Sequence, residues 1–178
     1  MVRLEGGDPF MFGRGGAECD ALRSAGIAVE GVPGITSGVA APLSPQIPVT
    51  DRRHAPGVAF ATGPTASPGG QAPEWAALAR SGLTIVIYMG VARCAELVGA
   101  LVAAGMAPET PAAAISAACT SRQRQVVCTL ATLAGSVERE RIASPAILVI
   151  GDVVSCADTS LLHAARAGEP RPSLALSG

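Results

Sequence analysis

Short apolar runs and one amphipathic stripe dominate the second half of the chain. Thr84–Tyr88 and Ala146–Ile150 are continuous apolar segments, a pattern typical of strands buried on both faces of a sheet. Between Arg93 and Ala104, apolar side chains recur every three or four residues, which predicts an amphipathic helix that ends at Gly105. Strands that alternate with helices in this way predict an α/β fold.

The same patterning predicts most of the other elements. Further strands are expected at Val2–Leu4, Ala28–Val32, Val58–Ala61, Ala112–Ile115 and Gln125–Thr129. Further helices are expected at Gly16–Ala25, Val39–Leu43, Glu74–Arg80 and Leu130–Arg139. We also expect Val153 and Val154 to extend the last strand past Gly151.

A proline-rich and charged stretch from Pro45 to Pro56 reads as a linker between two α/β lobes. We therefore expect a partial N-terminal lobe at residues 1–54, a C-terminal lobe at 55–156 and a disordered tail at 157–178. The loop Thr62–Pro73 is expected to be exposed and mobile. Because two strands alone do not form a stable sheet, the first lobe is expected to be incomplete.

Composition narrows the classes of function. Hydrophobic residues make up 49%, charged residues 15% and aromatic residues 3% of the chain, and its net charge is −1. These values argue against nucleic-acid binding and against attraction to an anionic membrane. No apolar run reaches the ~18 residues of a membrane span, and no signal-peptide core is visible, so we expect a cytoplasmic protein.

The cysteines and histidines do not indicate a metal site or a disulfide. Five scattered cysteines form no CxxC pair, and the two histidines have no partners at ligand spacing. We expect most of the cysteines to be small buried hydrophobic residues.

The strongest candidate for a binding site is the glycine-rich stretch Val2–Gly16. It predicts a strand, a glycine turn with Asp8-Pro9, and the start of a helix, a layout that binds ligands in many α/β proteins. Its spacing is not GxGxxG, and no Lys-Ser/Thr follows the glycines, so it is not a P-loop. The alternative is a plain connector between strand and helix.

The stretch VRLEGGDPFMFGRGG closely resembles the GGDPxxFGRGGEE loop of uroporphyrinogen-III C-methyltransferases, in the tetrapyrrole methylase family. Four further motifs follow at similar spacing: VPGITSG, IPVT, TIVIYMGVAR and SPAILVIGDVV. The resemblance covers Val2 to Val154. It implies two α/β lobes with the cofactor cleft between them, the first lobe being incomplete here.

The implied function is C-methylation of uroporphyrinogen III to precorrin-2 with S-adenosylmethionine, on the route to siroheme and cobalamin. The resemblance also implies a homodimer. By matching positions, the residues that hold S-adenosylmethionine are Gly6, Gly7, Asp8, Met11, Thr36, Ser37, Met89, Ala118 and Ala146. Arg14 matches the FGR arginine of the family and becomes the candidate catalytic residue, a clamp for substrate carboxylates.

Each of these assignments has a simpler alternative. For Asp8 it is a residue that closes its turn, for Thr36 and Ser37 a plain helix cap, and for Met89 core filling. For Arg14 the alternative is a solvated loop residue. Weaker candidates for carboxylate binding are Arg52, Arg53, Arg93, Arg122 and Arg124.

The chain departs from the family pattern at several points. Ala17 replaces an acidic residue of GGEE, Asp51 stands where a histidine is frequent, and Gly63-Pro64 replaces a usual Gly-His. The chain also starts after the GPGDP-type segment of the family. We therefore expect an N-terminally truncated chain with impaired turnover. The alternatives are a module that only binds the cofactor or a partner, and a generic nucleotide-binding α/β protein.

Overall fold

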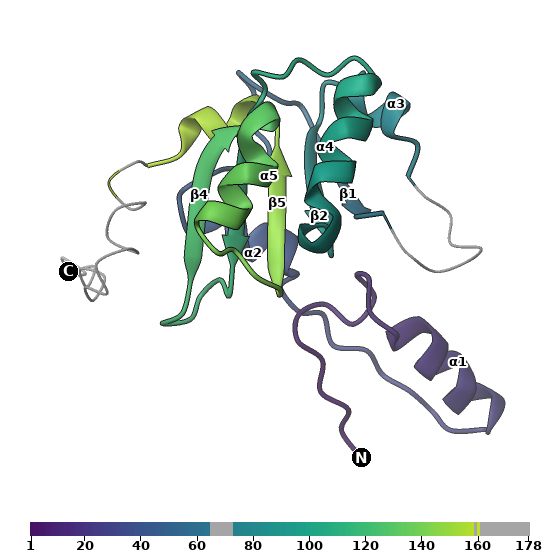
Figure 1. Cartoon of the computed structure of the whole chain (residues 1–178). Coiled ribbons are helices and arrows are strands. Elements are labelled where there is room, and N and C mark those ends of the chain that lie inside the picture. The colour runs from purple at the N-terminus through teal and green to yellow at the C-terminus, as the bar shows by residue number, and fades with distance from the viewer. Residues whose placement is uncertain (65–72, 159, 161–178) are drawn as a thin grey trace.

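A mixed sheet forms the centre of the computed structural model, which describes residues 1–64, 73–158 and 160 (Figure 1). Its five strands lie in the order β1-β2-β5-β3-β4. Their bounds are β1 Val58–Thr62, β2 Thr84–Tyr88, β3 Pro111–Ser116, β4 Arg124–Thr129 and β5 Ala146–Ile150. Strands β1 and β2 are parallel, and the remaining pairs are antiparallel. The predicted α/β class is confirmed.

The pairing register brings several strand ends to one end of the sheet. Tyr88 pairs with both Thr62 and Ile147, and Ser116 pairs with Ala146. The carboxyl ends of β1, β2 and β3 therefore lie beside the amino end of β5. We call this region, defined by Thr62, Tyr88, Ser116 and Ala146, the Tyr88 end of the sheet.

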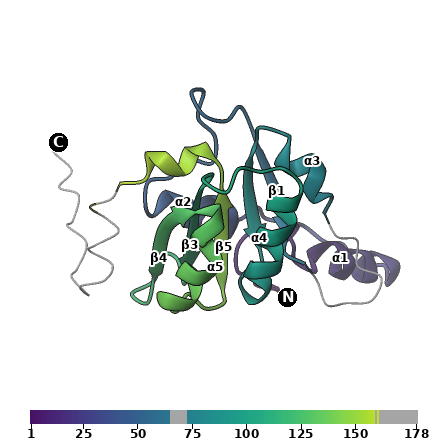
Figure 2. The same ribbon diagram turned by 45° about the horizontal axis from the view of Figure 1, so that its top comes forward.

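Three helices cover one face of the sheet, as Figures 1 and 2 show. They are α3 (Trp75–Ala79), α4 (Cys94–Ala103), which follows the short turn η1 (Val91–Arg93), and α5 (Leu130–Arg139). The predicted apolar faces of α4 and α5 are confirmed by four fully buried side chains, Leu97, Leu101, Leu130 and Leu133. This layer packs on alternate residues of the strands, such as Ile85 and Ile87.

The other face is covered by helix α2 (Ser37–Leu43), the segment after it and the turn η2 (Asp152–Cys156). Ile47 and Ala55 are almost fully buried and belong to the same cluster as Val86 and Val149. The segment Pro45–Pro56, predicted as a linker, therefore packs against the second face of the sheet, and its role as a linker stays a prediction. The lobe boundaries at residues 54 and 156 stay predictions.

The strands expected at Val2–Leu4 and Ala28–Val32 are wrong, since both segments are irregular. A strand needs a neighbour to pair with, and in the part of the chain that the structure describes no strand lies beside either segment. Helix α1 (Gly15–Ser24) forms as predicted, yet Gly15 is its one buried residue. Several large apolar side chains of this region, including Val2 and Val32, are exposed.

The expected extension of the last strand is also wrong. Val153 and Val154 lie in η2, where both are fully buried. Gly151 ends β5 because its φ of 138° lies in a region that favours glycine. Most of the expected disordered tail and of the expected mobile loop Thr62–Pro73 lies outside the described residues. No helix in the described part of the chain is long and apolar enough to cross a membrane.

The buried hydroxyl of Thr84 allows a test of how the core contributes to stability. Thr84 is fully buried, and its Oγ1 has no hydrogen-bond partner among the described residues. Thr84→Val keeps the shape and removes the unpaired polar group, so it should raise the free energy of unfolding by about 1 kcal/mol. Urea denaturation measures this change. Thr129→Val is the control, because the Thr129 hydroxyl bonds that of Thr132 at 3.1 Å and its loss should destabilise. A loss of stability in Thr84→Val would show that its hydroxyl has a partner.

Candidate functional site

Three of the predicted site positions meet at the Tyr88 end of the sheet. Met89 directly follows β2, and Ala146 begins the neighbouring strand β5. Ala118 follows β3 by two residues, and the amide of Ala117 donates to the Pro145 carbonyl at 3.0 Å. The strand register therefore brings together residues that lie far apart in the sequence.

The Tyr88 hydroxyl ties helix α2 to this end of the sheet. Its oxygen lies 2.6 Å from Thr36 Oγ1 and accepts a hydrogen bond from the Gly38 amide at 2.8 Å. Thr36 is the N-cap residue of α2, but its side chain makes no cap bond, so Tyr88 supplies the missing acceptor from another element. A Cβ atom on Gly38 would lie 2.3 Å from the Tyr88 oxygen, and so glycine is required there.

The glycine-rich loop lies against the turn before α2. A Cβ atom on Gly34 would lie 2.2 Å from the Gly7 carbonyl oxygen, so the two backbones are in direct contact. Asp8 accepts a hydrogen bond from the Phe10 amide at 2.9 Å and a longer one from the Gly34 amide at 3.5 Å. Asp8 therefore closes its turn, and its remaining lone pairs can still accept from a ligand.

Two residues carry the loop onto the Tyr88 end of the sheet. The Phe12 ring lies 4.8 Å from the Tyr88 ring, with φ of Phe12 at 52°. Met11 packs against the same core cluster as Ala118 and Tyr88. Gly6, Gly7, Asp8 and Met11 therefore belong to one loop that reaches Thr36 and Tyr88.

Some predicted site positions are exposed and do not belong to the core. The Met89 side chain is 61% exposed at a φ of 54°, so the alternative that it fills the core is wrong. Ser37 and Gly6 are exposed, and no atom lies within 4 Å of a Cβ built on Gly6. The bare backbone at Gly6 and the exposed thioether of Met89 are thus both accessible from outside.

A polar network fixes the loop that carries Ala118. Gln123 accepts from the Cys119 amide at 2.9 Å, and its side-chain amide donates to Ser44 at the end of α2 and to Gln125. Ala117 and Cys119 have left-handed backbone conformations. The loop is therefore held in a strained form, as is frequent at binding sites.

The arginine candidates differ in how far the protein itself uses them. Arg53 binds Asp51 with two bonds and lowers the pKa of that carboxyl below its usual range. Arg93 and Arg124 also bind described groups. The Arg14 side chain is exposed and makes no hydrogen bond or ion pair with the described residues. Arg52 and Arg122 are likewise exposed without a side-chain partner among the described residues, so three of the six candidates are free to bind an outside anion.

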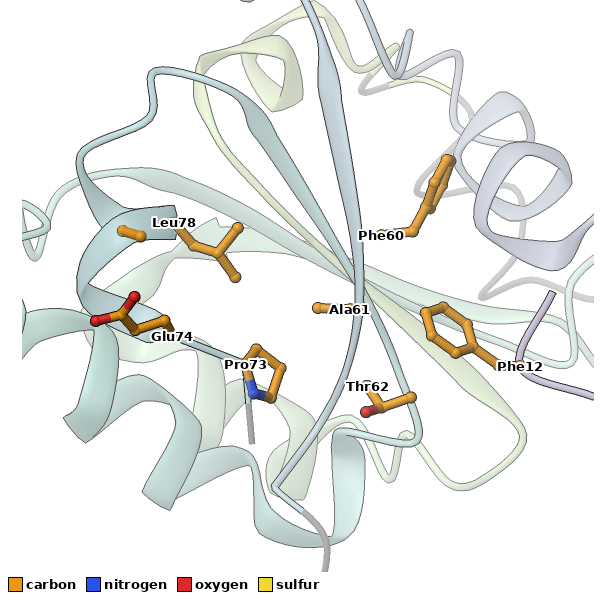
Figure 3. Close-up of a pocket in the computed structure, with 8 residues that line it drawn as sticks. Phe12, Phe60, Ala61, Thr62, Pro73, Glu74 and Leu78 are labelled. Carbon is orange, nitrogen blue, oxygen red and sulfur yellow. The ribbon is translucent and has the colours of Figure 1, made fainter. Parts of the chain in front are cut away.

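A cleft of about 400 Å³ opens beside strand β1 (Figure 3). Phe12 of the glycine-rich loop and Phe60 and Thr62 of β1 form one side. Glu74, just before α3, and Leu78, within α3, form the other. None of the nine predicted cofactor positions lines it. The sequence interpretation missed this cleft and Tyr88, although Tyr88 stood inside the quoted YMG motif.

The cysteines only partly follow expectation. Cys94 is buried, and burial raises its pKa to about 11. Cys19, Cys128 and Cys156 are partly buried. Cys119 is exposed and lies in the loop beside Ala118. Within the described ranges no group of three or more His, Cys, Asp and Glu could hold a metal ion.

Comparison with known proteins gives a consistent family. The family model for tetrapyrrole (corrin/porphyrin) methylases matches residues 1–134. The chain is 49% identical over 157 residues to a uroporphyrinogen-III C-methyltransferase of Synechocystis sp., covering 87% of this chain and 59% of the relative. It is 49% identical over 158 residues to a siroheme synthase of Chromobacterium violaceum, covering 89% of this chain and 33% of the relative. The chain thus spans between one third and three fifths of these relatives.

Solved structures agree with the sequence relatives. A uroporphyrin-III C-methyl transferase from Thermus thermophilus, complexed with S-adenyl homocysteine, is 38% identical and superposes with a TM-score of 0.74. The match covers 87% of this chain and 67% of that one. Cobalt precorrin-4 methyltransferase has a TM-score of 0.77 at 22% identity, which shows the shared fold.

The Tyr88 hydroxyl gives the clearest test of this geometry. Tyr88→Phe leaves the Gly38 amide without its acceptor and the Thr36 hydroxyl without its partner. We expect it to lower the free energy of unfolding by about 1–3 kcal/mol in urea denaturation. Thr36→Val should cost less, because the Gly38 amide keeps its acceptor. A Tyr88→Phe variant as stable as the parent would show that the hydroxyl does not hold α2.

Proposed function

The chain belongs to the tetrapyrrole methylase family, and we propose that it transfers methyl groups from S-adenosylmethionine to carbon atoms of uroporphyrinogen III. One observation carries the proposal. The register of the sheet and the Tyr88 hydroxyl gather the glycine-rich loop, the start of α2, Met89, Ala118 and Ala146 at one end of the sheet. The C-methyltransferase relatives support the reaction, and the relative bound to S-adenyl homocysteine supports the cofactor.

The residues at the Tyr88 end fit S-adenosylmethionine by their chemistry. Gly6 and Gly7 present bare backbone, and Asp8 keeps lone pairs for a ligand's donors. Ala118 and Ala146 have small side chains, so a planar adenine can approach their backbone amides and carbonyls. Met89 offers an exposed, polarizable thioether surface.

The chain's own residues need to do little chemistry. When bound, S-adenosylmethionine supplies an activated methyl group on a sulfonium that is already a good leaving group. The protein then has to align donor and acceptor and to exclude water. Backbone carbonyls of the glycine-rich loop can hold a polarised methyl group through weak C–H···O contacts. A site built largely from backbone suits this task.

Arg14 is proposed as the substrate clamp. Uroporphyrinogen III carries eight carboxylates, and a guanidinium binds a carboxylate through two parallel hydrogen bonds. Arg14 precedes the first residue of α1, and its side chain has no hydrogen bond or ion pair in the described part of the chain. The loop that would bind the cofactor therefore also presents a cation to the acceptor.

Finer features of the function follow from the resemblance alone. They are precorrin-2 as the product, a place in siroheme or cobalamin synthesis, a homodimer and a cytoplasmic location. The comparisons give no support to the alternative of a module that only binds the cofactor or a partner. The chain departs from the family at Ala17, Asp51 and Gly63-Pro64. We expect these departures to weaken binding of the acceptor and to leave the cofactor loop in place.

A methylation assay tests the function and the role of Arg14 together. The chain is incubated without oxygen with uroporphyrinogen III and S-adenosylmethionine labelled in the methyl group, and S-adenosylhomocysteine binding is measured by calorimetry. Arg14→Ala should raise KM for uroporphyrinogen III by about tenfold, since bonds between charged groups contribute ~1.5–3 kcal/mol, and leave the calorimetric Kd unchanged.

Arg23→Ala is the matched control, because Arg23 lies on α1 and pairs with Asp20 on the same helix. It should change neither constant. No label transfer and no S-adenosylhomocysteine binding by the parent chain would contradict the proposed function. An unchanged KM in Arg14→Ala would remove Arg14 from the site.

Cys119 offers a chemical probe of the loop that carries Ala118. Its exposed thiol should react with iodoacetamide, whereas Cys94, with its pKa raised by burial, stays protonated and unreactive near pH ~8. The added bulk should weaken S-adenosylhomocysteine binding by about tenfold, and bound S-adenosylhomocysteine should slow the reaction. Cys119→Ser should make binding insensitive to the reagent, whereas Cys19→Ser should not. Full binding after complete alkylation of Cys119 would place the cofactor elsewhere.

A further inference from the structure

We propose that the cleft beside β1 holds a pyrrole-bearing edge of the tetrapyrrole acceptor and not the cofactor. The proposal rests on the proposed function and assigns its acceptor to a place that none of the nine cofactor positions lines. Its walls come from three separate elements, namely the glycine-rich loop, strand β1 and the start of α3 (Figure 3).

The cleft has the size and the lining of a small-molecule site. Its volume of about 400 Å³ lies within the usual range of ligand pockets. Phe12, Phe60 and Leu78 give it apolar and aromatic walls, which suit the faces of pyrrole rings. A whole octacarboxylate macrocycle does not fit such a space, so the rest of the ring and most of its carboxylates would extend outside.

The polar groups of the cleft decide which side of the macrocycle enters. Glu74 lines the rim of the cleft, its carboxylate points away from β1, Phe12 and Phe60 (Figure 3), and its side chain has no hydrogen bond or ion pair with the described residues. A carboxylate repels the carboxylates of the acceptor and accepts hydrogen bonds from pyrrole N–H groups. The N–H groups should therefore point toward Glu74, and the carboxylates toward solvent and cations such as Arg14.

The position of the cleft matches what methyl transfer requires. The acceptor carbon must come within ~3–3.5 Å of the methyl donor, so the acceptor site has to adjoin the cofactor positions. Phe12 and Phe60 both contact Tyr88, with ring centroids 4.8 and 6.2 Å away. Tyr88 in turn precedes Met89 and bonds Thr36. The cleft thus lies one side chain away from the proposed cofactor site.

Filling the cleft tests the assignment. Ala77 lines it from an exposed position on α3, so Ala77→Trp adds bulk without burying a new side chain in the core. We expect KM for uroporphyrinogen III to rise by about tenfold or more, with the Kd of S-adenosylhomocysteine changed less than about twofold. Ala131→Trp, at an exposed position of α5 outside the cleft, is the matched control and should change neither value. Thermal denaturation checks that both variants fold.

Charge removal tests the orientation of the acceptor. Glu74→Gln keeps the size of the side chain but weakens its acceptor oxygen, so KM for uroporphyrinogen III should rise about threefold, within the strength of a charge-assisted bond. Glu138→Gln, on an exposed position of α5, is the control. A lower KM in Glu74→Gln would mean that substrate carboxylates face this wall and would overturn the proposed orientation.

The measurements distinguish a failure of the cleft assignment from a failure of the proposed methyl transfer. A weaker S-adenosylhomocysteine Kd in Ala77→Trp would assign the cleft to the cofactor, and two unchanged constants would show that it binds neither; either result overturns the proposal. Retention of fluorescent uroporphyrin III on ultrafiltration measures acceptor binding without turnover. If the parent chain transfers no methyl group but Ala77→Trp still loses about tenfold in uroporphyrin III binding, the proposed function fails and the cleft assignment stands.

Discussion

The Tyr88 hydroxyl is the contact on which the arrangement of the site depends. Tyr88 ends the fully buried strand β2, and its oxygen serves the Thr36 hydroxyl and the Gly38 amide at once. Through this oxygen the start of α2 is fixed over the sheet, and through its ring the glycine-rich loop is held by Phe12. Apart from Met11, which packs on the same core cluster, Tyr88 is the residue of the sheet that the glycine-rich loop contacts here. Tyr88 therefore holds the glycine-rich loop and the start of α2 in place relative to each other.

Backbone packing against backbone does the rest. The Gly34 backbone contacts the Gly7 carbonyl. The Gly63 backbone contacts Gly90, since a Cβ atom on Gly63 would lie 2.5 Å from the Gly90 Cα. The Gly63 amide also bonds the Tyr88 carbonyl at 2.7 Å, which draws the ends of β1 and β2 together. Such contacts leave little room for side chains, which is why the site presents mainly amides and carbonyls.

The sequence predicted elements whose apolar pattern is matched by local partners. Thr84–Tyr88, Ala146–Ile150 and the helix at Leu130–Arg139 formed as expected because their apolar faces find one continuous core. Val2–Leu4 has a similar local pattern, but no strand lies beside it in the described part of the chain. A local apolar pattern does not reveal whether a partner strand is present. Pro45–Pro56 looked like a linker because its few apolar residues, such as Ile47, are widely spaced, yet those few are the ones that are buried. Ala118 and Ala146 were found through the family resemblance, since an alanine that matters through its backbone has no signature in a single sequence.

The mixed pairing of the sheet brings Ala118 and Ala146, two of the proposed cofactor positions, to the same end. In a purely parallel sheet, one end carries the carboxyl ends of all strands. Here β5 runs opposite to β2 and β3, so its amino end lies among their carboxyl ends. The backbone before Ala146 and the backbone after Tyr88 and Ser116 therefore meet at the same end. There the Ala117 amide bonds the Pro145 carbonyl, and the Gly63 amide bonds the Tyr88 carbonyl. Under the proposed function, the carboxylates of the acceptor are left to exposed cations such as Arg14, and the cleft beside β1, which begins at Thr62 of this end, is left to its pyrrole edge.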